Sequence, residues 1–294
     1  MDTTVMEIDT ITESFKLDIL VLEHQNFMNS LYNKSDIILD ESVLDEFKEK
    51  IKELIKRIKE AIHKLIAKLK EFLSRFVNEN KIRIKAYNCD FKHLPDNYIF
   101  NNVYEYKESV AFANELKSKH DNIKKLIDKV IINTNYINGS EMEKAITDIQ
   151  TEYDYYYENK DNVLPKIVNY SGKDAKKLFA KFEELNNIYF KLTYDNTSSL
   201  ISYLKKADSK VDKLGDNFVK AINGKDVNMF SKHQDIQTYN YHSINANLQA
   251  FCNQYIQFFS LCCKMILMYK DIAGVIRLSY SNIVNKIIEL CKND

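Results

Sequence analysis

Residues that make tight turns are scarce in this sequence. It contains 5 Gly and 2 Pro among 294 residues, and it has no Trp. Sandwiches, barrels and doubly wound α/β folds need turn residues at short intervals, so none of these folds is expected. The phosphate-binding patterns GxxxxGK[ST] and GxGxxG are absent as well, which argues against the nucleotide-binding folds built on them. The composition instead predicts a mainly α fold, a bundle of long helices with few interruptions.

Targeting and membrane signals are also lacking. The first residues form no basic leader, so we expect no cleaved signal peptide. The most apolar stretch, Tyr255 to Tyr269, contains Gln257 and Lys264 and is shorter than the roughly 20 apolar residues that span a bilayer, so we expect no transmembrane helix. The five cysteines form no CxxC pair and lie in apolar stretches, which favours buried thiols in a reducing compartment.

Charge is balanced overall, with 42 basic and 42 acidic side chains, but it is unevenly distributed. Residues 1–42 hold nine acidic side chains and two lysines, whereas residues 43–86 hold 13 basic and 7 acidic side chains. Charge and apolar patterning together divide the chain into four parts. These are an acidic segment 1–42 with one helix from about Ser14 to Tyr32, a basic amphipathic helix 43–79, a strand and loop region 80–104, and a helical bundle 105–294 with a linker near 161–172.

The helix of residues 43–77 shows the clearest periodicity in the chain. Its apolar residues recur every 11 positions, about 3.67 residues per turn, so they form a nearly straight stripe along one side. The stripe consists of Leu44, Phe47, Ile51, Ile55, Ile58, Ile62, Ile66, Leu69 and Leu73. The basic face on the opposite side carries Lys48, Lys52, Lys56, Arg57, Lys59, Lys64, Lys68 and Arg75.

This helix has several interpretations, which the sequence leaves open. Its apolar stripe suits packing into the protein's own core, and it also suits insertion at a membrane surface, because the polar face is rich in Lys. The basic face suits salt-dependent contact with nucleic-acid phosphates. It equally suits docking on an acidic surface, either of a partner protein or of residues 1–42.

The residues after this helix change from helical period to alternation. Lys81 to Tyr87 alternates apolar and polar residues, and residues 98–104 form a second candidate strand, so we predict a small two-stranded β element near residues 80–105. Helices are expected at about 105–136, 140–159, 174–222 and 235–291, the third with a candidate break near 195–197. The linker near 161–172 is inferred from Pro165 and Gly172.

No constellation of side chains points to catalysis. The six histidines are scattered, and Cys89 with His93 offers two of the about four ligands that a structural zinc site needs. We therefore predict no catalytic residue, no cofactor, no metal and no small-molecule substrate. The tyrosines of residues 153–157 are expected to pack against a neighbouring helix, with base stacking or a partner interface as alternatives.

The order of segments carries a resemblance. An acidic N-terminus is followed by FKEKIKELIKRIKEAIHKLIAKLKEFLSRF, then by ENKIRIKAYNCDF, and then by polar helices. Over about residues 1–110 this order resembles the internal virion structural proteins of tailed bacteriophages. The resemblance implies a non-enzymatic protein that is made in the host cytoplasm, packed in or on the capsid, and in some cases delivered with the DNA.

The implied partners are other virion proteins or further copies of this chain, with DNA or a membrane surface as additional contacts. The first hypothesis is therefore a virion structural protein. The alternatives are a membrane-active protein that uses helix 43–77 and a nucleic-acid packaging protein that uses the basic face of that helix.

Overall fold

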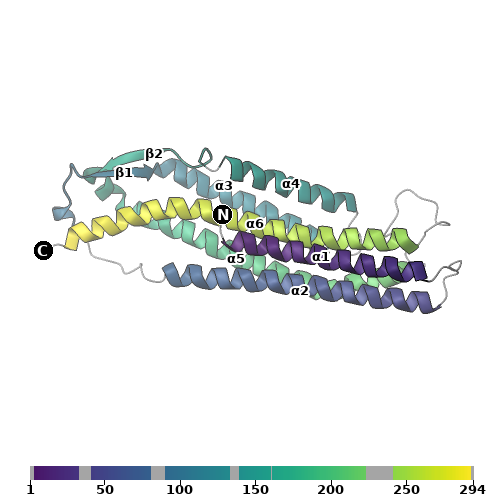
Figure 1. Ribbon diagram of the computed structural model, residues 1–294. Coiled ribbons are helices and arrows are strands. Elements are labelled where there is room, and N and C mark those ends of the chain that lie inside the picture. The colour runs from purple at the N-terminus through teal and green to yellow at the C-terminus, as the bar shows by residue number, and fades with distance from the viewer. Residues whose placement is uncertain are drawn as a thin grey trace. The chain divides into compact units, whose positions relative to one another are not determined.

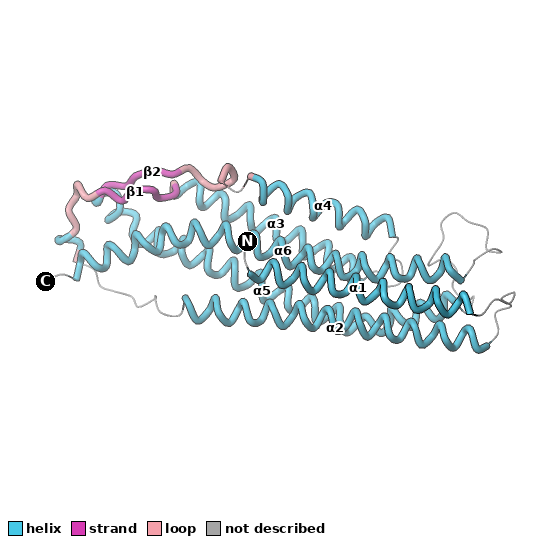
Figure 2. Tube along the Cα trace, viewed as in Figure 1, coloured by secondary structure: helices cyan, strands magenta, loops and turns pink. Residues whose placement is uncertain are grey.

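The computed structural model describes residues 3–32, 41–80, 90–132, 139–159, 161–222 and 241–292, and it confirms the mainly α fold (Figures 1 and 2). The helices within these residues are α1 (Thr3–Tyr32), α2 (Glu41–Asn80), α3 (Tyr106–Ile132), α4 (Gly139–Glu158), α5 (Gly172–Ile222) and α6 (Tyr241–Lys292). The described chain also contains a 3-10 turn at Phe91–His93 and the strands β1 (Ile99–Tyr104) and β2 (Ile167–Ser171).

Helix α1 begins earlier than the sequence pattern predicted. We expected it from about Ser14, whereas it starts at Thr3. The additional turns are stabilised by burial of Val5, Ile8 and Ile11, which lie before the predicted start. Tertiary packing therefore orders the turns that precede the predicted start.

Helix α5 runs without the break that was considered near residues 195–197. Asn196 and Thr197 are both buried, and the Thr197 hydroxyl donates to the carbonyl oxygen of Thr193 at 2.9 Å. This bond satisfies a side chain that otherwise competes with the helical backbone. The two polar residues are therefore accommodated inside the helix.

The two-stranded sheet exists, but its pairing differs from the prediction. β1 pairs antiparallel with β2, with Phe100 opposite Tyr170 and Tyr104 opposite Ile167. The partner strand thus comes from the region that was predicted as a linker, while the candidate strand Lys81 to Tyr87 lies outside the described residues. A bulge interrupts the pairing at Asn102, which has a positive φ of 58°.

Both strands lead directly into capped helices. Glu105 follows β1, and its carboxylate accepts a hydrogen bond at 2.8 Å from the amide of Glu108 in the first turn of α3. Ser171 ends β2, and its hydroxyl accepts at 3.1 Å from the amide of Asp174 in α5. Glycine is required at position 172 between β2 and α5, because a Cβ there would collide with the carbonyl oxygen of Pro95.

The described elements form two compact units, each built from separate stretches of the chain. Unit 1 comprises Met1–Glu71, Lys124–Thr151 and Leu200–Lys264, and unit 2 comprises Phe72–Ile123, Glu152–Ser199 and Met265–Asp294. Helix α1 belongs to unit 1 alone and both strands belong to unit 2. Helices α2 to α6 each contribute residues to both units.

In unit 1, α1 lies alongside α2 and α6 and runs antiparallel to both (Figure 1). Helix α2 also runs antiparallel to α5, against which it packs closely. A Cβ on Gly215 of α5 would lie 2.9 Å from Cγ1 of Ile55 on α2, so the small residue permits this approach.

In unit 2, buried tyrosines connect the helices to the junction of β1 and α3. The Tyr189 hydroxyl donates to the Ser109 carbonyl oxygen at 2.6 Å, and the Tyr280 hydroxyl donates to the Tyr104 carbonyl oxygen at 2.6 Å. Burial raises the pKa of both hydroxyls, so they remain protonated donors at neutral pH. The ring of Phe182 packs against that of Tyr280, with 5.3 Å between the two centroids.

Candidate functional site

The apolar stripe of α2 packs into the core of the protein. Among its predicted members, the following are buried: Ile51, Ile55, Ile58, Ile62, Ile66 and Leu69. Leu73 is partly exposed, and the side chains of Leu44 and Phe47 lie outside the described residues. Between Ile51 and Leu69, burial of this stripe leaves α2 without an apolar face for a membrane in this conformation.

The basic face of α2 is largely engaged by carboxylates. Within α2, Lys48 pairs with Asp45 at 2.7 Å, Lys52 with Glu49 at 2.5 Å, and Arg57 with Glu53 at 3.0 Å. Lys59 reaches across to Asp212 of α5 at 2.6 Å. Lys56, Lys64 and Arg75 are exposed. The face is therefore mixed in sign rather than a continuous basic track.

Two carboxylates of α1 pair with this same face. Asp18 lies 3.3 Å from Arg57, and Glu7 lies 3.1 Å from Lys68. Hydrogen bonds to Glu7 and then to Glu71 raise the pKa of Lys68 above its usual value. The acidic first segment and the basic second segment thus contact one another in the folded chain, as one of the docking interpretations anticipated.

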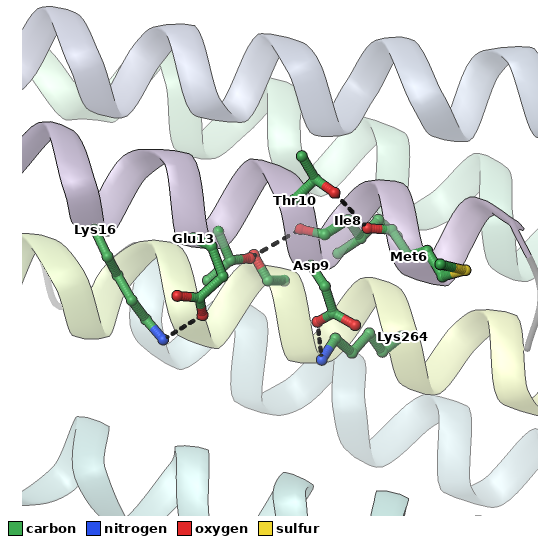
Figure 3. Close-up of polar contacts among 9 residues, drawn as sticks. Met6, Ile8, Asp9, Thr10, Glu13, Lys16 and Lys264 are labelled. Carbon is green, nitrogen blue, oxygen red and sulfur yellow. Dashed lines mark hydrogen bonds and ion pairs between the residues drawn. The ribbon is translucent and has the colours of Figure 1, made fainter.

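The other flank of α1 contacts α6 (Figure 3). There Asp9 forms an ion pair with Lys264, whose side chain is 18% exposed. One helical turn away, Thr12 Oγ1 lies 2.7 Å from Ser260 Oγ and 3.0 Å from the Ile8 carbonyl oxygen. Because a hydroxyl carries one proton, Thr12 donates to Ile8 while Ser260 donates to Thr12. Polar contacts on both flanks therefore fix how α1 is rotated about its axis.

The side of α1 that faces away from α2 and α6 is unexpectedly apolar. We call it the outer stripe, and it consists of Met6, Thr10, Glu13, Leu17, Leu20 and Val21. Met6, Leu17, Leu20 and Val21 are 54%, 61%, 56% and 53% exposed. At 100° per residue these positions fall within an arc of about 100°. Helix α1 is thus apolar on two sides, and of these the described residues cover the inner one alone.

The outer stripe was not predicted from the sequence. A helix that is apolar all round is usually buried all round. The available signal was the set Leu17, Leu20 and Val21, which lies off the line through Phe15 and Ile19 that defines the inner side. This stripe is the largest group of strongly exposed apolar side chains on one helix among the described residues.

The tyrosine cluster of α4 divides between core and surface. Tyr153 and Tyr156 are buried, as packing against neighbouring helices requires, whereas Tyr155 and Tyr157 are more than half exposed. The Tyr156 ring packs edge-on against that of Tyr269 on α6, at 5.5 Å between centroids. The packing prediction therefore holds for one half of the cluster.

A polar group near these rings is structural in character. Glu152 accepts hydrogen bonds from the Tyr269 hydroxyl and from Lys119, both at 2.8 Å. Burial and the nearby Glu152 raise the pKa of Tyr269, so this hydroxyl stays protonated at neutral pH. The carboxylate is held by two donors, which leaves it as a bridge between α3, α4 and α6 rather than a free base.

The remaining reactive groups do not converge. One Glu-x-x-His spacing occurs on α2, where Glu60 is exposed and His63 Nε2 lies 3.1 Å from Asp208 Oδ1 of α5, but a di-iron bundle needs further carboxylates beside it. Within the described residues, no group of three or more His, Cys, Asp or Glu side chains is placed to hold a metal ion. Cys252, Cys262 and Cys263 are buried in α6, and burial raises the pKa of Cys252 to about 12.

Two further features concern the surface. A shallow depression in unit 2 is lined by α5 alone, through Glu183, Glu184, Asn187 and their neighbours, so side chains do not converge on it from different elements. None of the helices, as far as they are described, combines the length and apolar character needed to cross a bilayer.

Comparison with known proteins yields no relative: no protein-family model matches the chain, and no curated protein or solved structure is significantly similar to it.

Proposed function

We propose that this protein is a non-enzymatic structural component of a tailed-phage virion, held in or on the capsid by contacts between helix faces. The observation that carries the proposal is the outer stripe of α1, an exposed apolar surface on an otherwise well-packed bundle. Contiguous exposed apolar side chains on a soluble protein mark interaction surfaces. The phage assignment itself rests on the order of segments in residues 1–110.

The contacts of α2 favour this function over the two alternatives. Membrane insertion by α2 requires six buried apolar side chains of its stripe to leave the core, at roughly 1.5–3 kcal/mol each. Nucleic-acid packaging by its basic face requires cations that are free of carboxylates, yet Arg57, Lys59 and Lys68 are paired across helices. Assembly through α1 needs neither rearrangement.

Protein mass spectrometry of purified particles from the phage that encodes the chain tests this proposal. We expect the protein in multiple copies per particle. Absence from particles that are otherwise complete would contradict the virion assignment.

A variant pair connects incorporation to the surface. Leu20→Glu places a charge in the outer stripe, and Leu278→Glu places the same charge at a similarly exposed leucine of α6. We expect the first variant to be depleted from particles and the second to be incorporated normally. Equal incorporation of both variants would show that the outer stripe is not needed for incorporation into particles.

A further inference from the structure

The orientation of α1 is fixed by contacts on both flanks, which makes its exposed face a defined surface. Glu7 and Asp18 hold one flank to α2, while Asp9 and Thr12 hold the other to α6. The inner side buries Val5, Ile8, Ile11, Phe15 and Ile19. Rotating α1 to hide the outer stripe would break these contacts, and none of the described residues covers it.

We propose that the outer stripe is a self-association surface, on which α1 of a second copy of this chain packs antiparallel about a two-fold axis. The inference deepens the proposed function, because it names the occupant of the surface on which that function rests. A two-fold contact uses the same patch on both copies, so the patch must be complementary to itself.

The charges of the outer stripe meet this condition. Glu13 lies in the stripe and Lys16 lies at its edge, 65% and 42% exposed, and within one chain they pair at 2.8 Å. They carry opposite signs and sit near the middle of the described stripe. In an antiparallel helix pair like flanks face each other, so Lys16 of each copy meets Glu13 of the other.

The apolar residues fit the same register. Met6 lies toward one end of the stripe, and Leu17, Leu20 and Val21 lie toward the other. When two such helices run in opposite directions, Met6 of one copy lies opposite Val21 of the other. Each end of the contact then contains an apolar cluster, with the Glu13 and Lys16 pairs between the two clusters.

Other occupants fit less well. A membrane-binding face carries an excess of cations, whereas this stripe has one anion, with one cation at its edge. Nucleic acid also requires a net positive surface. The limited length of the described stripe indicates a contact below the size of standard stable interfaces, so we expect dissociation in the micromolar range.

Sedimentation velocity of the full chain from low to high micromolar concentration tests the proposal. We expect a monomer–dimer equilibrium. Leu17→Glu should weaken dimerisation at least about tenfold, because it buries a charge at the contact. Leu278→Glu is the matched control and should leave the equilibrium unchanged. Unaltered thermal unfolding would show that each variant is folded.

A charge-swap experiment tests the antiparallel register. Glu13→Lys alone and Lys16→Glu alone each give the stripe charges of one sign, so each variant should dimerise several-fold more weakly than the native chain. An equimolar mixture of the two variants restores opposite charges across the contact. The mixture should therefore form heterodimers with the native affinity or better.

Several results would overturn the inference. The first is a chain that stays monomeric at high micromolar concentration, and the second is a dimer that is insensitive to Leu17→Glu. The third is a monomer that sediments with anionic phospholipid vesicles and loses this binding in the Leu17→Glu variant. These solution measurements are independent of the particle analysis. A monomer that is found in particles contradicts only the self-association, whereas a dimer that is absent from particles contradicts only the virion role.

Discussion

At the scale of single residues, the hydroxyl contact between Thr12 and Ser260 is the buried polar link between α1 and α6 described above. Thr12→Val removes the acceptor of the Ser260 hydroxyl, and we expect a loss of about 1–2 kcal/mol in unfolding free energy. Ser260→Ala should cost a similar amount. If the contact is direct, the double variant should cost about 1 kcal/mol less than the sum of the two in urea unfolding.

The control for this cycle lies two residues away. Thr10 makes the same kind of bond, to the Met6 carbonyl oxygen at 2.9 Å, but it is exposed. Thr10→Val should change stability by less than about 0.5 kcal/mol. A loss as large as that of Thr12→Val would show that the effect comes from helix propensity and not from the contact with α6.

Buried thiols predict a specific alkaline sensitivity. Burial raises the pKa of Cys252 from 9.0 to about 12, so this thiol ionises in the unfolded chain before it ionises in the folded one. The contribution of the buried neutral thiol to the unfolding free energy is complete below pH 9 and is lost as pH rises from 9 towards 12. At pH 10 the loss is roughly 1 kcal/mol. Urea unfolding at pH 8 and pH 10 measures this loss.

The cysteine variants separate this effect from tyrosine ionisation. Cys252→Ala should show a smaller drop in stability between pH 8 and pH 10 than the native chain. Cys291→Ala, at a partly exposed position, should show the native drop. Identical pH dependence in all three proteins would rule out the buried thiol as the cause.

At the scale of elements, ion pairs set the strength with which α1 is held. Asp9→Asn removes the carboxylate that pairs with the largely buried Lys264, and we expect a loss of about 1 kcal/mol, between the values typical of exposed and buried pairs. Hydrogen exchange in residues 3–21 should accelerate at the same time. Both effects are measured on the full chain at low ionic strength.

An exposed ion pair on the same helix supplies the control. Glu13→Gln removes the partner of Lys16, which lies on the surface, and should cost less than about 0.5 kcal/mol. Equal effects of the two substitutions on hydrogen exchange would mean that the contact with α6 does not hold α1 in place.

Helix boundaries and helix faces differ in how well they can be predicted from the sequence alone. The stripe of α2 was predictable because Ile51, Ile58 and Ile62 repeat with a helical period over several turns. The start of α1 was not, because exposed Met6, next to buried Val5, obscures the period of the buried side. The outer stripe was missed for the same reason.

Strand pairing was harder to predict than helix formation. Ile167 and Val168 in β2 follow Pro165 and precede Gly172, and flanking Pro and Gly residues are typical of a loop. What makes this segment a strand is its pairing with β1, more than 60 residues earlier in the chain. The local pattern predicted a strand at β1, but a contact of that sequence separation does not reveal in the sequence which segment is its partner.

At the scale of the whole molecule, the two units predict that distant segments lose protection together. Ile62→Ala removes fully buried side-chain volume from unit 1 and should cost about 2–5 kcal/mol. Hydrogen exchange should then increase in residues 3–21, 124–130 and 200–216 of unit 1 more than in β1 and β2 of unit 2. Peptide-resolved mass spectrometry provides this map.

The neighbouring residue Lys64 provides the comparison. It is exposed on the same helix, so Lys64→Ala should leave both the exchange map and the unfolding free energy nearly unchanged. A uniform increase across both units in Ile62→Ala would show that they unfold as one cooperative body.

The division of unit 1 among distant parts of the chain also has a consequence for biosynthesis. Helices α1 and α2 leave the ribosome early, but Ser260 and Lys264, which hold α1 in place, are translated nearly 200 residues after Glu71. At elongation rates of about 5–20 residues per second that interval lasts on the order of 10–40 s. Throughout it, the inner apolar side of α1 and the stripe of α2 lack their final cover, so newly made chains are expected to depend on chaperones until α6 emerges.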